Sequence, residues 1–148
     1  MLPPVAEERI TKLEEQLAVA LPLEYRISLC VHEGTAEHVW LWNAVSLSKI
    51  GVVVDDWTVF LEMSSPSHRR NQGAKLKSQG PVRTSLFDQC WIPIASDNGI
   101  PICLDLNPLP GGIAGQVIYV DWEDGTVRVI ANGFAEFLAD GLKKMRST

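Results

Sequence analysis

The sequence predicts a single domain of mixed helices and strands, with helices in the first half, strands in the second and a closing helix. Apolar residues recur at helical spacing in the first half, whereas residues 91–130 hold short apolar runs separated by turn-forming residues. A length of 148 residues is the usual size of one domain. The content of 46% hydrophobic and 21% charged residues is ordinary for a globular protein and argues against disorder.

The first half of the chain predicts a helical hairpin. Residues 5–19 form its first helix, with a charged face and an apolar face that consists of Ile10, Leu13 and Leu17. Pro22 opens the second helix, since a proline in the first turn leaves no helical hydrogen bond unmade. The residues spaced for burial in this helix are Tyr25, Leu29 and Cys30. Gly34 is expected to end it, because glycine readily adopts the left-handed conformation found at helix C-termini.

The middle of the chain is expected to hold an aromatic strand, a third helix and a loop. Residues 38–43, HVWLWN, form the strand candidate. Ser46 or Ser48 is expected to cap the helix. Its apolar residues at helical spacing are Leu47, Ile50, Val54, Trp57 and Leu61. Three valines at 52–54 leave a strand possible there, since β-branched residues favour strands. Residues 64–83, rich in small polar residues, are predicted to form a mobile basic surface loop.

The second half predicts a set of strands followed by a helix. The predicted strands cover residues 91–96, 102–106, 116–121 and 126–130. Pro93 cannot donate to a sheet, which places the first strand at an edge or makes it carry a bulge. Asp97-Asn98-Gly99 and Asp124-Gly125 predict tight turns, because glycine accepts a positive φ angle. The closing helix covers residues 134–145, with inward-facing Phe134, Phe137, Leu138 and Leu142.

Charge is distributed unevenly along the chain. The total of 13 basic against 18 acidic residues, a net charge of −5, argues against a nucleic-acid binder, which needs a basic surface. Residues 64–83 contain bases and no acid: Arg69, Arg70, Lys75, Lys77 and Arg83. Residues 84–127 contain acids and no base: Asp88, Asp97, Asp105, Asp121, Glu123 and Asp124. Such a polarised field acts on partner choice and association rate rather than on the fold.

The cysteines and the N-terminal residues favour a reducing cytoplasm. Cys30, Cys90 and Cys103 lack the spacing of a zinc or redox site, and their apolar neighbours predict buried, free thiols. The N-terminal residues lack the basic region and apolar core of a signal peptide. No apolar run approaches the roughly 20 residues that span a membrane, so no membrane association is expected.

No catalytic residue, metal site or cofactor is predicted. Asp121, Glu123 and Asp124 lack the ligand spacing of a calcium loop and suit turn or surface positions. Cys30 and His32 are two residues apart, a spacing that does not bring side chains together on a helix. The glycine-rich residues 111–115 precede a strand rather than a helix N-terminus, so they do not predict a phosphate site.

The tryptophans are stronger candidates for a specific role. Trp42 and Trp91 lie in predicted strands and are expected to pack in the core. Trp122 adjoins the predicted hairpin turn, where both core packing and contact with a partner stay open.

Several motifs, taken in order, resemble the SUKH superfamily and, within it, the Smi/Knr-type branch named for fungal cell-wall assembly regulators. These are LPxEYR at 21–26, HEG at 32–34, Trp42 with Leu47, WIPIASDxG at 91–99, CLDLNP at 103–108 and GQV at 115–117. The FAEFL sequence at 134–138 is similar to the last helix of that family, so the likeness extends over roughly residues 10–142. The resemblance implies an α+β fold, with a helical hairpin and further helices around a central, mainly antiparallel sheet.

The resemblance also implies a protein-binding module without enzymatic activity. Bacterial members of the superfamily are described as immunity proteins that neutralise a toxin domain, often a nuclease or deaminase, whereas fungal members are regulatory interaction proteins. We therefore expect an immunity protein that binds a toxin domain with a basic surface. A regulator of the cell-wall assembly type is the alternative, and an enzyme that uses the carboxylates or Cys90 is a third hypothesis.

The acidic segment supplies the expected contact surface. A nuclease site that binds phosphates is basic, so an acidic inhibitor gains both electrostatic steering and complementarity. The candidate contact residues are Asp97, Asp105, Asp121, Trp122, Glu123 and Asp124. Because side chains alternate along a strand, only part of this set can share one face. Two departures from the family pattern, at residues 100–101 and 84–87, affect this surface more than the fold.

Overall fold

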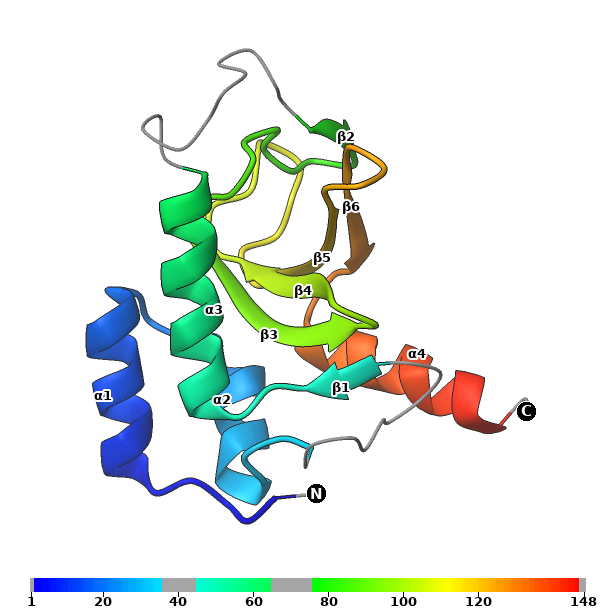
Figure 1. Ribbon diagram of the computed structural model, residues 1–148. Coiled ribbons are helices and arrows are strands. Elements are labelled where there is room, and N and C mark those ends of the chain that lie inside the picture. The colour runs from blue at the N-terminus through cyan, green and yellow to red at the C-terminus, as the bar shows by residue number, and fades with distance from the viewer. Residues whose placement is uncertain (1, 36–44, 65–75, 147–148) are drawn as a thin grey trace.

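The helices lie along two sides of a central sheet (Figure 1). The computed structural model describes residues 2–35, 45–64 and 76–146. Over these residues the chain forms four helices and a six-stranded, mostly antiparallel sheet, which confirms the α+β class. The elements are α1 (Glu7–Leu17), α2 (Leu23–Val31), β1 (Val45–Leu47), α3 (Ile50–Met63), β2 (Lys77–Gln79), β3 (Trp91–Asp97), β4 (Ile100–Asp105), β5 (Gln116–Asp121), β6 (Thr126–Ala131) and α4 (Phe134–Arg146).

The strands are arranged in the order β1-β3-β4-β5-β6-β2. Neighbouring strands are antiparallel except β2, which is parallel to β6. Because β3 lies between β1 and β4, Pro93 occupies a bulge rather than an edge, and the register against β4 shifts between Pro93 and Ala95. The extra residue at this point accommodates a proline that cannot donate a ladder hydrogen bond.

Each face of the sheet carries its own hydrophobic cluster. On one face, residues such as Ile102 and Val117 pack with the apolar sides of α1, α2 and α4. On the other face, Ile118 packs with the fully buried Trp91, as predicted for that tryptophan. Helix α3 joins the two clusters, because its Trp57 packs against both. The Trp57 Nε1–H also donates to the carbonyl of Gln89, 2.9 Å away, and so fixes the chain just before β3.

Two helices begin at carboxylates supplied by other parts of the chain. The predicted serine cap of α3 is wrong, because residues 45–47 form β1 and the helix begins only at Ile50. The Ile50 N–H instead donates to Glu33 Oε2 at 3.2 Å. At the start of α4, the Ala135 N–H donates to Glu24 Oε2 at 2.9 Å. A carboxylate in this position satisfies a free helix N–H and interacts favourably with the helix dipole.

The helical hairpin is confirmed, but α2 differs from the prediction at its end. The buried residues include all of those predicted except one: Ile10, Leu13, Leu17, Tyr25 and Leu29. Cys30 is exposed, because it lies on the outward side of α2, which carries apolar residues as the buried side does. The helix ends at Val31, before Gly34. Gly34, at φ 149°, instead allows a close approach, since a Cβ there would lie 2.9 Å from the carbonyl oxygen of Leu47.

Residues 76–83 are part of the fold, which corrects the prediction of a surface loop over 64–83. Leu76 and Val82 are buried, and the Lys77 N–H donates to the carbonyl of Gly125 at 2.8 Å. Parallel pairing with a distant strand leaves no local turn signal, so β2 was not predictable from its own residues. Residues 65–75, and the strand predicted at 38–43 with Trp42, lie outside the described residues.

The closing helix is confirmed in position, with one difference in its buried face. Phe134 and Phe137 are buried, and Leu138 packs partly against the same cluster. Leu142, however, is 48% exposed rather than inward-facing. Leu142 is on the last part of α4, and Figure 1 shows this part extending past the edge of the sheet toward the C-terminus.

Candidate functional site

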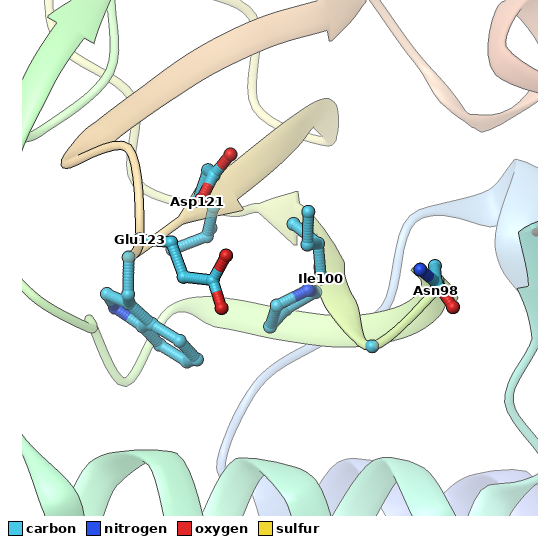
Figure 2. Close-up of a pocket in the computed structure, with 8 residues that line it drawn as sticks. Asn98, Ile100, Asp121 and Glu123 are labelled. Atoms are coloured by element: carbon cyan, nitrogen blue, oxygen red, sulfur yellow. The ribbon is translucent and has the colours of Figure 1, made fainter.

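A hollow lies where the β3–β4 turn approaches the end of β5 (Figure 2). Its volume is about 440 Å³, and its lining residues are Asn98, Gly99, Ile100, Pro101, Val120, Asp121, Trp122 and Glu123. Figure 2 shows the Glu123 carboxylate directed toward Ile100, whereas the Asp121 carboxylate points away from it. The hollow therefore brings together three of the residues predicted to contact a partner.

The two turns beside the hollow have the backbone conformations that their sequences predicted. Asn98 and Gly99 both have positive φ angles, 50° and 88°, as a tight two-residue hairpin requires. Gly125 has a φ of 73°, and the Asp124 N–H donates to Asp121 Oδ1 at 3.0 Å. Local backbone geometry thus sets the walls of the hollow.

Trp122 is packed on one side and open on the other. Its Nε1–H donates to the carbonyl of Leu86 at 2.7 Å. The indole makes an edge contact with Phe60, with 5.0 Å between ring centroids, and a tilted contact with Phe87 at 6.4 Å. The side chain nevertheless remains 37% exposed. It therefore presents a fixed aromatic surface to the solvent, a geometry that suits the anchor residue of a protein interface.

The other predicted acidic residues divide between two environments. By strand register, Asp97 and Asp121 share the sheet face of Tyr119. Burial, and then these two carboxylates, raise the pKa of Tyr119, while the Arg128 guanidinium over its ring acts in the opposite direction. Glu123 and Asp124 are exposed in the β5–β6 turn. The acidic surface is therefore split, and only its Glu123 side opens into the hollow.

Asp105 is not a surface residue, which corrects the prediction that it contacts a partner. Its side chain has no exposed area. Asp105 Oδ2 accepts from Gln116 Nε2 at 2.9 Å, and Oδ1 accepts from the Asn107 N–H at 3.0 Å. Gln116 Nε2 also donates to the carbonyl of Pro81 at 3.1 Å. This buried network ties the β4–β5 loop to the segment that follows β2, a role in folding rather than in binding.

An apolar groove adjoins the hollow at Trp122. It has a volume of about 240 Å³, and its lining residues are Phe60, Met63, Ser64, Leu86 and Trp122. Met63 is 60% exposed at the end of α3. Neither Met63 nor Leu86 is distinguished by a motif or by its spacing in the sequence. The sequence indicated this groove only through residues 84–87, which include Leu86 and depart from the family pattern.

A second exposed apolar surface covers the outward side of α2. Leu23, Ile27 and Val31 are 70%, 54% and 66% exposed, and their four-residue spacing places them along one stripe. Periodicity predicted only the buried side of this helix, because both sides are apolar.

The described residues offer little support for metal or thiolate chemistry. Within residues 2–35, 45–64 and 76–146, no group of three or more His, Cys, Asp or Glu side chains is placed to hold a metal ion. Burial, followed by the charge of Asp88, raises the pKa of the Cys90 thiol, which disfavours the nucleophilic thiolate. Among the helices of these residues, none is both long and apolar enough to cross a membrane.

The fold and site define an α+β protein that presents a fixed tryptophan between an acidic hollow and an apolar groove. The model of the SMI1 / KNR4 family (SUKH-1) matches residues 4–140. The chain therefore belongs to this family, which confirms the resemblance found in its motifs.

Two curated relatives come from yeasts. The chain is 28% identical over 144 residues to the "cell wall biosynthesis/cell cycle regulator smi1" of Schizosaccharomyces pombe, covering 88% of this chain and 29% of that protein. It is 26% identical over 171 residues to the "cell wall assembly regulator SMI1" of Saccharomyces cerevisiae, covering 91% of this chain and 34% of that protein. The chain thus spans about a third of the length of these relatives.

Proposed function

We propose that this chain is a non-enzymatic protein-binding module whose acidic hollow beside Trp122 receives a basic surface of a partner protein. The observation that carries the proposal is the pairing of an exposed carboxylate with a fixed aromatic side chain. Among the described residues, none donates a hydrogen bond or forms an ion pair to the Glu123 carboxylate. The hollow is lined by Asp121 and Glu123 and by no basic residue. Complementary charge then supplies steering and specificity toward a basic partner.

Several acidic residues of the first half are less suited to this role. Arg26 forms ion pairs with Glu7 and Glu14, and Arg9 pairs with Glu33 at 3.1 Å. Glu24 is held by the start of α4. These carboxylates are already engaged within the molecule, whereas Glu123 is available to a partner.

Two cellular roles are compatible with this binding chemistry. In the first, the partner is a toxin domain of the nuclease or deaminase class, and the chain is a cytoplasmic immunity protein. A basic, phosphate-binding surface on a nuclease would match the hollow. In the second, the chain is a regulatory interaction protein, a role supported by the names of the two yeast relatives.

Charge reversal in the hollow tests the proposal. The tagged chain, its Glu123→Lys variant and a Glu15→Lys control are used to capture proteins from the source cell, with quantitative mass spectrometry as the readout. Glu15 is an exposed residue of α1, so its replacement changes the net charge equally at another site. We expect a partner that the native chain and the control retain and Glu123→Lys loses. Equal capture by all three chains would contradict a role for the hollow.

Co-expression distinguishes the two roles. If the partner is a toxin, the native chain restores growth of cells that produce it, and Glu123→Lys does not. If the partner is not toxic and deletion of the chain's gene alters cell-wall sensitivity, the regulatory role is supported instead.

A further inference from the structure

The hollow and the groove lie on two sides of one side chain. Trp122 is the residue that lines both depressions. The hollow is lined by Asp121 and Glu123, with the Glu123 carboxylate directed into it, whereas the groove is lined almost entirely by apolar side chains, with Ser64 as its polar member. The two depressions therefore differ in chemistry, although a single bound segment could reach both.

Three residues that line the groove, Phe60, Leu86 and Trp122, are held in place. Phe60 contacts both Phe87 and Trp122 edge-on, with ring centroids 5.4 Å and 5.0 Å apart. The Trp122 hydrogen bond fixes the Leu86 carbonyl. A preformed apolar wall needs little ordering when a ligand binds, which favours affinity.

We infer that the partner segment is an extended stretch of protein with a Lys or Arg and a bulky apolar residue two positions apart. This inference rests on the proposed function and specifies its ligand. In an extended segment, side chains i and i+2 lie on the same side about 6.6 Å apart, so they can straddle one aromatic side chain. The apolar side chain enters the groove beside Met63 and Leu86. The cation enters the hollow, where it meets the Glu123 carboxylate and the exposed part of the Trp122 ring.

Charge is the reason to assign a basic segment rather than a neutral apolar one. An apolar ligand alone would fill the groove and leave Glu123 without a partner. Conversely, a purely basic surface would leave Met63, 60% exposed, uncovered. Only a segment that combines both side chains covers both depressions.

Selection of peptides on the full chain tests the inference. A display library of random peptides is selected on the native chain and, separately, on variants of each depression. Met63→Asp alters the groove and Glu123→Lys alters the hollow. Val59→Asp is the matched control for the first, because Val59 is 48% exposed on the same helix and does not line the groove. Glu15→Lys is the control for the second.

We expect enrichment of Lys or Arg two positions from Leu, Ile, Met, Phe or Trp on the native chain and on both controls. A labelled peptide of the enriched family should bind either site variant at least about tenfold more weakly, by fluorescence anisotropy. Replacing its basic residue by Glu, or its apolar residue by Ser, should weaken binding similarly. Trp122 is left unchanged, because its replacement would also remove the Leu86 hydrogen bond. Circular dichroism confirms that each variant is folded. If Met63→Asp fails to fold, Met63→Ser replaces it as the groove variant.

The outcomes separate this inference from the proposed function. No enrichment, or enriched peptides with only basic or only apolar residues, would overturn the bipartite ligand. So would peptide binding that Met63→Asp leaves unchanged. If the cellular partner is lost with Glu123→Lys but retained with Met63→Asp, the acidic contact stands and the bipartite recognition falls.

Discussion

Glu24 of α2 accepts a hydrogen bond from the backbone N–H of Ala135, 2.9 Å away although the two residues are 111 positions apart. The contact links the N-terminal hairpin to the start of the closing helix. Gly133 lies beside this contact, and a Cβ at that position would come 2.9 Å from Glu24 Oε2, so the carboxylate would have to shift to make room for it. The helix receives its cap from tertiary structure instead of from a neighbouring serine or threonine.

Replacement of Glu24 is expected to weaken the docking of α4. Glu24→Ala removes the acceptor for the Ala135 N–H and should lower the free energy of unfolding by about 1 kcal/mol, the usual cost of a lost cap. Glu24→Gln keeps an oxygen acceptor and should cost less. Urea denaturation measures both, with the exposed Glu15→Ala as control. Equal stability of Glu24→Ala and the control would show that the cap contributes nothing.

Two glycines give opposite expectations for the same substitution. Gly34→Ala should lower the free energy of unfolding by about 1–3 kcal/mol, because the new Cβ would meet the Leu47 carbonyl in a φ region that disfavours alanine. Gly51→Ala should raise it by about 0.5–1 kcal/mol, since Gly51 lies in α3 with open space around it. Thermal and urea denaturation of the pair measure the difference. Destabilisation by Gly51→Ala, or none by Gly34→Ala, would contradict this account.

Local patterns predicted most elements of this fold because their causes are local. The buried face of α1 follows from periodicity, and the turns at Asn98 and Gly125 follow from residues that accept positive φ. The start of α3 was misplaced because its cap, Glu33, lies far back along the chain. The strand β2 was missed for a similar reason, since its partner β6 is distant in sequence.

The candidate site was only partly predictable. Trp122 and Glu123 were identified because they lie in a recognisable turn beside a run of acids. Asp105 was included wrongly, because composition does not distinguish an exposed carboxylate from one buried against Gln116. The groove depends on Phe60 and Leu86 meeting at Trp122, and no spacing within the sequence encodes that contact.

The three cysteines should differ sharply in reactivity. Cys30 is exposed and is expected to react first with a thiol reagent such as DTNB. Cys103 is fully buried, and burial, followed by the charges of Asp56 and Asp105, raises the pKa of its thiol. It should react only as fast as the chain unfolds, with Cys90 between the two. Peptide mass spectrometry after timed labelling ranks them, and labelling of Cys103 as fast as Cys30 in the native protein would contradict the structure.

The buried Asp105 predicts a specific pH dependence of stability. Burial raises the pKa of the Asp105 carboxyl in the folded state above its value in the unfolded chain. At a pH between these two pKa values, folding is therefore accompanied by the uptake of a proton. Protonated Asp105 therefore makes its full contribution to the free energy of unfolding below the unfolded pKa, about 3.9 for aspartate. This contribution is lost as the pH rises through the pKa of the folded state. Asp105→Asn places a second N–H donor opposite the Gln116 amide. The substitution should lower the free energy of unfolding by about 1–3 kcal/mol in acid and by less at higher pH. Urea denaturation from acid to neutral pH, with the exposed Glu15→Gln as control, tests this; a constant difference between Asp105→Asn and the native chain would exclude Asp105 as the titrating group.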